Sequence, residues 1–278
     1  MKRIAIQGVR ACFHDVAARK YFKNESLSMV ECDSFPKLCR SLEEKHSDFA
    51  IMAIENTIAG SILPNYALLE AHGFKILGET YLRIEMCIMA LPDQKIEEIR
   101  FVKSHPMAIL QCQDFLEKHP DIQVVEGSDT AESALEIGRD QKKQYAAIAS
   151  KLAAETYGLN LLAENIETNR SNYTRFLILS RAEDYQKPAG ANKASVVFEA
   201  SHEPGSLARL LTMLGSYGVN LTKIQSMPIL GRPYQYAFHV DLEWKDESKY
   251  QEALKQLQSQ TSRLLHFGEY LSGEKPVL

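Results

Sequence analysis

The chain has 278 residues, of which 45% are apolar and 24% charged, so it can form a sizeable core and is not expected to be disordered. Its formal net charge is −4 and no stretch concentrates Lys and Arg, which argues against nucleic acid and membrane surfaces as partners. No segment approaches the roughly 20 apolar residues of a membrane-spanning helix, and the first 15 residues do not resemble a secretory signal. The five cysteines include no CxxC pair, which favours a reduced, cytoplasmic protein without structural zinc.

Apolar, β-rich runs alternate with helical patterns through the first 180 residues. Strands are predicted at 3–7, 49–54, 84–90, 100–102, 123–126, 146–148 and 175–179. Helices are predicted at 15–21, 62–71, 108–115 and 131–138. Strand–helix alternation with short connections predicts an α/β fold with mostly parallel sheets.

The pattern changes after a polar stretch, 182–193, which contains Pro188 and Gly190 and is predicted to be a linker. Beyond it the predicted order is strand 194–200, helix 206–216, strands 219–227 and 234–243, helix 247–258 and strand 263–269. This βαββαβ order predicts a second, α+β domain of the ferredoxin-like type.

Three polar segments, around Asn56, Ser104 and Asp129, lie where predicted strands end, and α/β folds bind ligands there. Glu55, Asn56 and Thr57 follow one such strand, although an ordinary capped turn explains them equally well. Ser104 suits an N-cap, and Pro106 suits the first turn of the helix after it. Free amides at a helix start bind carboxylates, but capping alone also accounts for this segment.

Asp129 is also predicted to cap a helix, and Glu132 three residues later completes the pattern of a capping box. Thr174 and Arg175 stand at the start of an apolar strand. An arginine there can hold a carboxylate with two hydrogen bonds, and a hydroxyl can bond to a leaving group. A structural arginine beside a strand is the common alternative.

Other chemistries have less support in the sequence. Cys112 and His105 are about two helical turns apart, which argues against direct contact. Cys12 and His14 have no further metal ligands at a suitable spacing. The chain also lacks the glycine-rich phosphate-binding motifs. We therefore expect no cofactor and no metal.

Several segments together resemble the prephenate dehydratase family. They are IENT (54–57) with Gly60, SHPMAILQC (104–112), SDTAES (128–133), AAIASKLAAETYGL (146–159) and NYTRF (172–176). The tail HEPGSLARLLTMLGSYGVNLTKIQSMP (202–228) is similar to the ACT domain of the same family. The resemblance implies a two-lobed catalytic domain like periplasmic binding proteins at 1–181, the linker, and an ACT domain at 194–278. It implies that the chain crosses between the lobes near Glu79 and near Ala163.

The implied activity is that of a carbon–oxygen lyase. It is the decarboxylating dehydration of prephenate to phenylpyruvate in L-phenylalanine biosynthesis, regulated by L-phenylalanine through the ACT domain. Arogenate dehydratase, whose substrate has an amine in place of the keto group, is one alternative. A non-catalytic phenylalanine-binding regulator is another. ACT domains pair between subunits, which implies a homodimer or homotetramer.

The resemblance also implies roles for individual residues. Thr174 hydrogen-bonds the departing hydroxyl, Arg175 pairs with a carboxylate, and Phe176 completes the catalytic motif. The implied substrate-binding residues are Glu55, Asn56, Thr57, Ser104, His105, Gln111, Asp129, Thr130, Ala131 and Asn172. The implied effector-binding residues are Gly205, Ser206, Leu207, Asn220, Leu221, Gln225 and Ser226, with Asn220 expected close to the Gly205 turn. His14 and His105 are alternative proton donors, for which packing or capping is the simpler role.

The chain departs from the family pattern in its first loop and in its tail. The family's G-x-x-G-[ST]-[YF]-[ST] loop is here 8–14, where Ala11 replaces the second glycine and both hydroxyl residues are missing. Met227 replaces the arginine of the family's ESRP motif.

Overall fold

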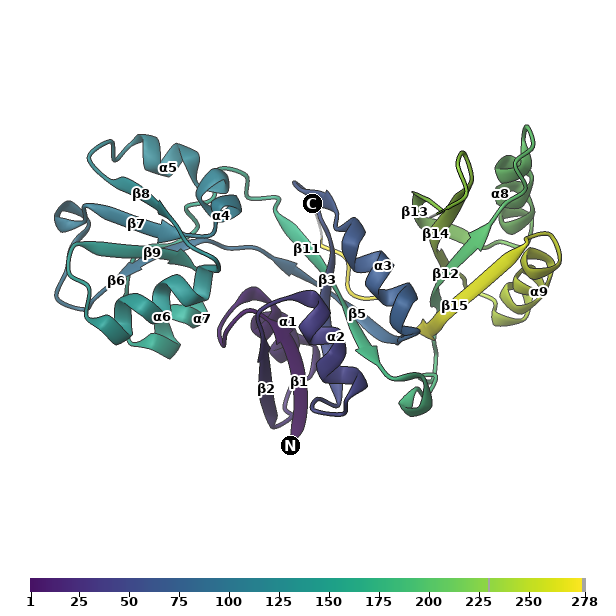
Figure 1. The fold of residues 1–278 in the computed structure, drawn as a ribbon, viewed down its shortest axis with the longest axis horizontal. Helices are drawn as coiled ribbons and strands as arrows, with labels where there is room; N and C mark the ends of the chain where they lie inside the picture. The colour runs from purple at the N-terminus through teal and green to yellow at the C-terminus, as the bar shows by residue number, and fades with distance from the viewer. Residues whose placement is uncertain (230, 277–278) are drawn as a thin grey trace. The chain divides into compact units, whose positions relative to one another are not determined.

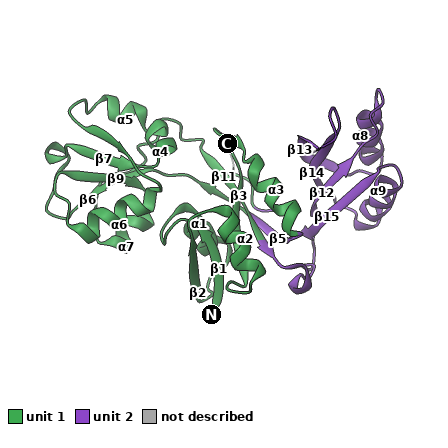
Figure 2. Ribbon diagram, viewed as in Figure 1, with its two compact units in different colours: residues 1–72, 80–178, 274–278 green, residues 73–79, 179–273 purple. Residues whose placement is uncertain are grey.

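The structure is a computed structural model that describes residues 1–229 and 231–276. The chain forms two compact units, coloured green and purple in Figure 2. Unit 1 contains residues 1–72 and 80–178 with a short C-terminal segment from Glu274, and unit 2 contains residues 73–79 and 179–273. In the part of the chain that the structure describes, no helix is long and apolar enough to cross a membrane.

The first sheet has the strand order β2-β1-β3-β11-β5, with β4 paired to β3 (Figure 1). Its strands are β1 (Lys2–Gln7), β2 (Leu27–Cys32), β3 (Phe49–Asn56), β4 (Gly60–Ser61), β5 (Lys75–Arg83) and β11 (Tyr173–Ser180). Its helices are α1 (Phe13–Tyr21), α2 (Phe35–Glu43) and α3 (Leu63–His72). The apolar runs at 4–6 and 50–54 are buried throughout, as expected for strands covered on both faces.

The second sheet has the order β10-β6-β9-β7-β8. Its strands are β6 (Cys87–Ala90), β7 (Phe101–Ser104), β8 (Gln123–Glu126), β9 (Tyr145–Ala149) and β10 (Asn160–Ala163). Its helices are η1 (Ile96–Glu98), α4 (Pro106–Gln111), α5 (Gln113–Glu117), α6 (Thr130–Asp140) and α7 (Lys151–Tyr157). β7 is parallel to β8 and β9, but β6 is antiparallel to β9 and β10. This sheet is therefore mixed, and the helix expected at 108–115 is interrupted at Cys112.

The chain passes from the first sheet to the second through residues 84–86 and returns through 164–172. The first passage is predicted near Glu79. That residue lies inside β5, because the strand continues to Arg83. Two passages between two sheets give the two-lobed arrangement that the resemblance implied.

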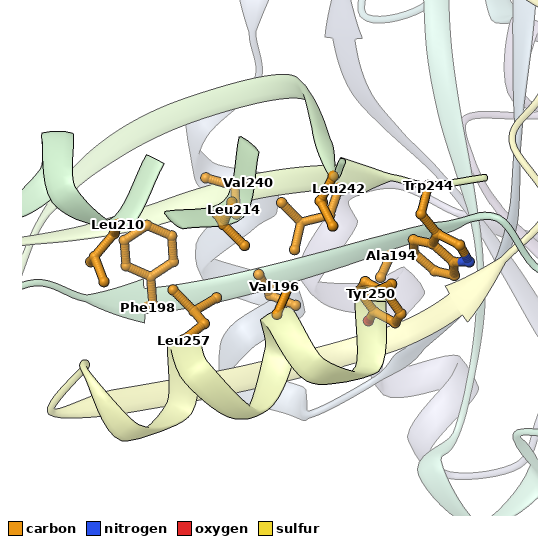
Figure 3. Close-up of a cluster of buried hydrophobic side chains, with 12 residues drawn as sticks. Ala194, Val196, Phe198, Leu210, Leu214, Val240, Leu242, Trp244, Tyr250 and Leu257 are labelled. Atoms are coloured by element: carbon orange, nitrogen blue, oxygen red, sulfur yellow. The ribbon is translucent and has the colours of Figure 1, made fainter. Parts of the chain in front are cut away.

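Unit 2 contains the βαββαβ order predicted for it. Its elements are η2 (Ala182–Asp184), β12 (Lys193–Glu199), α8 (Ser206–Ser216), β13 (Asn220–Pro228), β14 (Tyr236–Glu243), α9 (Glu247–Ser259) and β15 (Arg263–Tyr270). The sheet order β13-β14-β12-β15 is that of a ferredoxin-like fold. Figure 3 shows the core, in which side chains of α8 and α9 pack on the sheet around Val196, Phe198 and Leu242.

Residues 73–79 belong to unit 2 because they pack against β15. The Nζ of Lys75 donates to the carbonyl of His266 at 2.6 Å, and Gly78 forms a bridge to Leu271. A Cβ on Gly268, whose φ is +127°, would lie 2.8 Å from the carbonyl oxygen of Ile76. Glycine therefore permits this close approach of two backbones.

Unit 2 also buries a charged cluster. The Lys193 side chain is 1% exposed, and its Nζ lies 2.9 Å from Glu79 and 3.3 Å from Glu243. The same oxygen of Glu79 accepts a hydrogen bond from the amide of Gly273 at 3.0 Å. A buried ammonium requires partners of this kind. Lys193 was predicted to end the linker, but it is the first residue of β12.

Candidate active site

Unit 1 contains a cavity of about 300 Å³ at the ends of strands from both of its sheets. Of the predicted site residues, those that line it are Asn56, His105, Gln111, Asp129, Thr130, Thr174 and Phe176. Asn56 ends β3, His105 follows β7, and Thr174 lies near the start of β11. The fold thus brings together predicted residues from four separate segments of the sequence.

Thr174 is held by a chain of side-chain amides. The Nδ2 of Asn56 donates to Thr174 Oγ1 at 2.9 Å and to Asn172 Oδ1 at 2.8 Å. The Oδ1 of Asn56 accepts from the backbone amides of Ile58 and Ala59, which fixes the orientation of the amide group. Because Thr174 Oγ1 is an acceptor here, its own proton remains available to a group in the cavity.

Asn172 extends this chain to the other lobe without lining the cavity. It is completely buried, and its Nδ2 donates to Gln111 Oε1 in α4 at 2.9 Å. Thr57 supports the same segment from outside the cavity. Its hydroxyl donates to the carbonyl of Ser171 and accepts from the amide of Tyr173. Neither residue lines the cavity, and both hold the segment that carries Thr174.

Arg175 is not among the residues that line the cavity. It lies in β11 between Thr174 and Phe176, both of which do line it, and it is 5% exposed. Its pairing with a substrate carboxylate therefore stays a prediction. Glu55 is in the same situation in β3, one residue before Asn56, and is also absent from the lining.

Ser104 is not the cap of α4 and does not line the cavity. Its hydroxyl donates to the carbonyl of Ile148 at 2.6 Å inside the second sheet. The cap is His105, whose Nδ1 accepts from the amide of Met107 at 3.2 Å, and Pro106 takes the first helical position as predicted. The strand is longer than expected and includes Ser104, which moves the cap to His105.

Asp129 caps α6, as predicted. Its Oδ1 accepts from the amides of Ala131 at 2.8 Å and Glu132 at 3.0 Å. Burial raises the pKa of the Asp129 carboxyl, and the two amides oppose this rise. Ala131 is buried and does not line the cavity. Its contribution is the backbone amide that bonds to Asp129. The Glu132 side chain bonds to Ser128, so the predicted capping box is incomplete.

The first loop contributes Cys12, Phe13 and His14 to the lining, and Gln7 at the end of β1 lies beside them. Of these four, only His14 was considered as a contact of the substrate, as an alternative proton donor. Burial lowers the pKa of His14 to about 4, and its ring packs edge-on against Phe176. Burial also raises the pKa of the Cys12 thiol. At neutral pH this loop therefore presents an uncharged imidazole and a thiol, so His14 has the packing role rather than that of a proton donor.

The remaining lining residues missed by the sequence analysis are mostly apolar and include Phe35, Ile62, Ile84 and Met107. Phe35 opens α2, an element that was not predicted at all, and Ile84 lies in the passage between the lobes. Gln7 could have been found, because it ends the first predicted strand, where ligand contacts gather.

Unit 2 has a second cavity, of about 340 Å³, next to the start of α8. Its lining consists of residues 200–204, Ser206, Gln235, Tyr236 and Phe238. Ser206 is the predicted effector residue found there. Those that do not line it are Gly205, Leu207, Asn220, Leu221, Gln225 and Ser226.

Asn220 is not close to the Gly205 turn within one chain. It pairs with Glu243, as does Lys193 at the start of β12. The Gly205 turn instead follows Glu199 at the other end of β12. Glu199 pairs with Ala237, and Ala237 also pairs with Met227 near the end of β13. Asn220 and the turn thus lie at opposite ends of the sheet, because α8 runs back along the strands before β13 begins.

Comparisons with known proteins point to one family. The model described as prephenate dehydratase matches residues 4–184. A bifunctional chorismate mutase/prephenate dehydratase of Aquifex aeolicus is 37% identical over 96% of this chain and 73% of the relative. A chloroplastic arogenate dehydratase/prephenate dehydratase 2 of Arabidopsis thaliana is 36% identical over 96% of this chain and 72% of the relative.

Solved structures agree in fold over nearly the whole chain. A protein described as GqqA, a novel type of quorum quenching acylase, has a TM-score of 0.88 at 29% identity and covers 98% of both chains. Prephenate dehydratase from Arthrobacter aurescens, in complex with L-Phe, has a TM-score of 0.86 at 27% identity, covering 99% of this chain and 92% of that one. With the family match over more than half of its length, the chain belongs to the prephenate dehydratase family of carbon–oxygen lyases.

Proposed function

We propose that this chain catalyses the decarboxylating dehydration of prephenate to phenylpyruvate, with arogenate as the alternative substrate of the same reaction. The observation that carries the proposal is the amide-held hydroxyl of Thr174 in the cavity. Both substrates carry a ring carboxylate and, across the ring, a hydroxyl. Loss of carbon dioxide supplies the electron pair that completes the aromatic ring as the carbon–oxygen bond breaks.

Thr174 donates a hydrogen bond to the departing hydroxyl in this mechanism. Asn56 occupies one lone pair of Thr174 Oγ1, which leaves the hydroxyl proton to point to the ligand. Threonine is too weak an acid to transfer that proton completely. Its contribution is to stabilise the negative charge that develops on the leaving oxygen, and bulk water completes protonation.

Neutral donors hold the substrate in the cavity. Thr130, the first residue of α6, lies in the lining and can offer its hydroxyl to the substrate. His105 accepts at Nδ1, so a neutral ring carries its proton on Nε2 and is a second donor. Positioning by such groups suits a reaction whose driving force lies in the substrate itself.

A hydrolytic acylase reaction, of the kind described for GqqA, has less support here. That reaction requires an activated nucleophile or a base beside it. Burial keeps the Cys12 thiol protonated, and the thiol donates to the carbonyl of Gln7. The His14 ring accepts from the backbone amide of Ala53 at 3.4 Å rather than activating this thiol. A non-catalytic regulator is disfavoured because the Thr174 network is complete.

L-phenylalanine is the proposed effector, and unit 2 its receptor. The Arthrobacter aurescens relative is described as a complex with L-Phe. The unit 2 cavity offers Tyr236 and Phe238 for a phenyl ring, Glu203 for an ammonium group and the start of α8 for a carboxylate. We further propose that the chain forms a homodimer or homotetramer through this domain.

The test is a turnover assay of the purified full-length protein on prephenate and on arogenate, with and without L-phenylalanine. We expect phenylpyruvate from the first substrate or phenylalanine from the second, and a rate that changes with added effector. Absence of turnover on both substrates would contradict the proposed reaction. Turnover that is indifferent to millimolar L-phenylalanine, with no heat of binding by calorimetry, would contradict the effector role alone.

A further inference from the structure

The cavity of unit 1 has an unusual charge for a site that binds dicarboxylates. Among the described residues, no Lys or Arg lines it, and Asp129 is its one carboxylate. Prephenate carries two negative charges, whereas arogenate carries an additional ammonium group and a net charge of −1. Like charges brought together at low dielectric repel each other, so a carboxylate in the lining disfavours the dianion.

The two histidines of the lining do not replace a lysine or arginine. His14 stays neutral because it is buried, and its pKa is about 4. The Nδ1 of His105 accepts a hydrogen bond from the amide of Met107, so this nitrogen is already engaged by the protein. Neither ring therefore supplies the fixed positive charge that a dianion would require.

Asp129 has one oxygen free for a ligand. The helix amides of Ala131 and Glu132 both bond to Oδ1. From the residues that the structure describes, Oδ2 accepts no hydrogen bond. It lies on the side of Gly8, 3.0 Å from where a Cβ on that glycine would be. The helix cap thus fixes the carboxylate of a residue that lines the cavity, while Oδ2 keeps its capacity to accept from a ligand.

Building on the proposed dehydratase reaction, we propose that Asp129 selects a substrate whose side chain bears an ammonium group, and that the chain prefers arogenate to prephenate. The ammonium pairs with Asp129 Oδ2, and this pairing offsets the charge of the one carboxylate in the lining. The keto group of prephenate is only an acceptor, so it leaves this carboxylate without a partner. Selection by an unpaired buried polar group is stronger than selection by size alone.

The test measures kcat/KM of the full-length protein for both substrates at the same pH and ionic strength. We expect wild type to favour arogenate by at least about tenfold. Asp129→Asn keeps an oxygen for the helix amides, since Asn and Asp cap helices equally well, and removes the charge. It is expected to lower kcat/KM for arogenate about 10- to 100-fold and to leave or raise that for prephenate.

Glu132→Gln is the matched control. It removes a carboxylate from the same helix turn, but Glu132 does not line the cavity, so the ratio of the two kcat/KM values is expected to stay unchanged. Thermal melting of each variant separates loss of the cap from loss of selectivity. A wild type that prefers prephenate overturns the inference and leaves the dehydratase function intact. So does an equal loss on both substrates in Asp129→Asn. A wild type inactive on both refutes the function itself.

Discussion

Two buried polar clusters of this chain differ in charge and in what they do. The cluster around Thr174 consists of neutral amides and a hydroxyl and opens onto a cavity. The cluster around Lys193 pairs an ammonium with two carboxylates inside unit 2. Neutral groups can orient a hydrogen-bond donor without adding a charge to the site. A buried charge instead requires a partner of opposite charge, and burying each of the two groups has a large desolvation cost.

The largest expected effect comes from breaking the charged cluster. Lys193→Met removes the cation between Glu79 and Glu243 and leaves two carboxylates facing each other. We expect the free energy of unfolding to fall by about 3–5 kcal/mol, measured by denaturant titration. Lys151→Met is the control, because its pair with Glu164 is exposed and is expected to change stability by at most about 0.5 kcal/mol. Equal effects of the two substitutions would contradict a structural role for Lys193.

Removing the hydroxyl from the neutral cluster is expected to affect the rate instead. Thr174→Ala should lower kcat by about 10²–10³ while changing KM little, because the bond to the leaving oxygen strengthens as charge develops. Thr174→Ser retains the hydroxyl and is expected to retain most of the activity. A near-normal kcat in Thr174→Ala would identify another donor, for which His105 is the first candidate.

The orientation of the hydroxyl can be tested separately from its presence. Asn56→Asp replaces the donor amide by a carboxylate, so the Thr174 hydroxyl donates to the introduced carboxylate rather than to the substrate. We expect kcat to fall about 10- to 100-fold, with no further loss when the change is combined with Thr174→Ala. Additive losses in this double-mutant cycle would show that Asn56 acts independently of Thr174.

Many of the residues in this comparison could be predicted from the sequence. The segments that carry Thr174, Asn56 and Asp129 were identified, and the six elements of the βαββαβ order in unit 2 were predicted to within two residues at each end. Their signals are local: turn residues, caps and strand periodicity. The same periodicity distinguishes Thr174 and Phe176, which line the cavity, from Arg175 between them, which does not.

Other features depend on contacts between distant residues. Lys193 bonds to Glu79 across 114 residues, and nothing near either position signals that pairing. Strand β5 was missed because Gly78 and Glu79 interrupt its apolar pattern, and both residues are explained by packing in unit 2. The expected contact between Asn220 and the Gly205 turn failed for the same reason, since strand direction is a property of the whole sheet.

The smallest expected effect concerns the first loop. Ala11 has φ +66°, a left-handed conformation that costs an L-residue about 1–2 kcal/mol. Ala11→Gly relieves this strain but loses a buried methyl group, about 0.8 kcal/mol, and adds chain entropy, about 0.5–1 kcal/mol. We expect the free energy of unfolding, measured by denaturant titration, to stay within about 0.5 kcal/mol of wild type. Ala17→Gly, in the helical conformation of α1, is expected to lose clearly more. A larger loss in Ala11→Gly would show that the methyl packing dominates.

The backbone at Ala11 has a consequence for how such families are recognised. Its amide donates to Asp15 and its carbonyl accepts from Ser150, so hydrogen bonds hold a turn that glycine usually makes. In this chain a residue other than glycine therefore holds the left-handed conformation at this position. A sequence motif that requires glycine at this position rejects this chain. A motif that instead specifies the backbone conformation, and every residue able to adopt it, would still match.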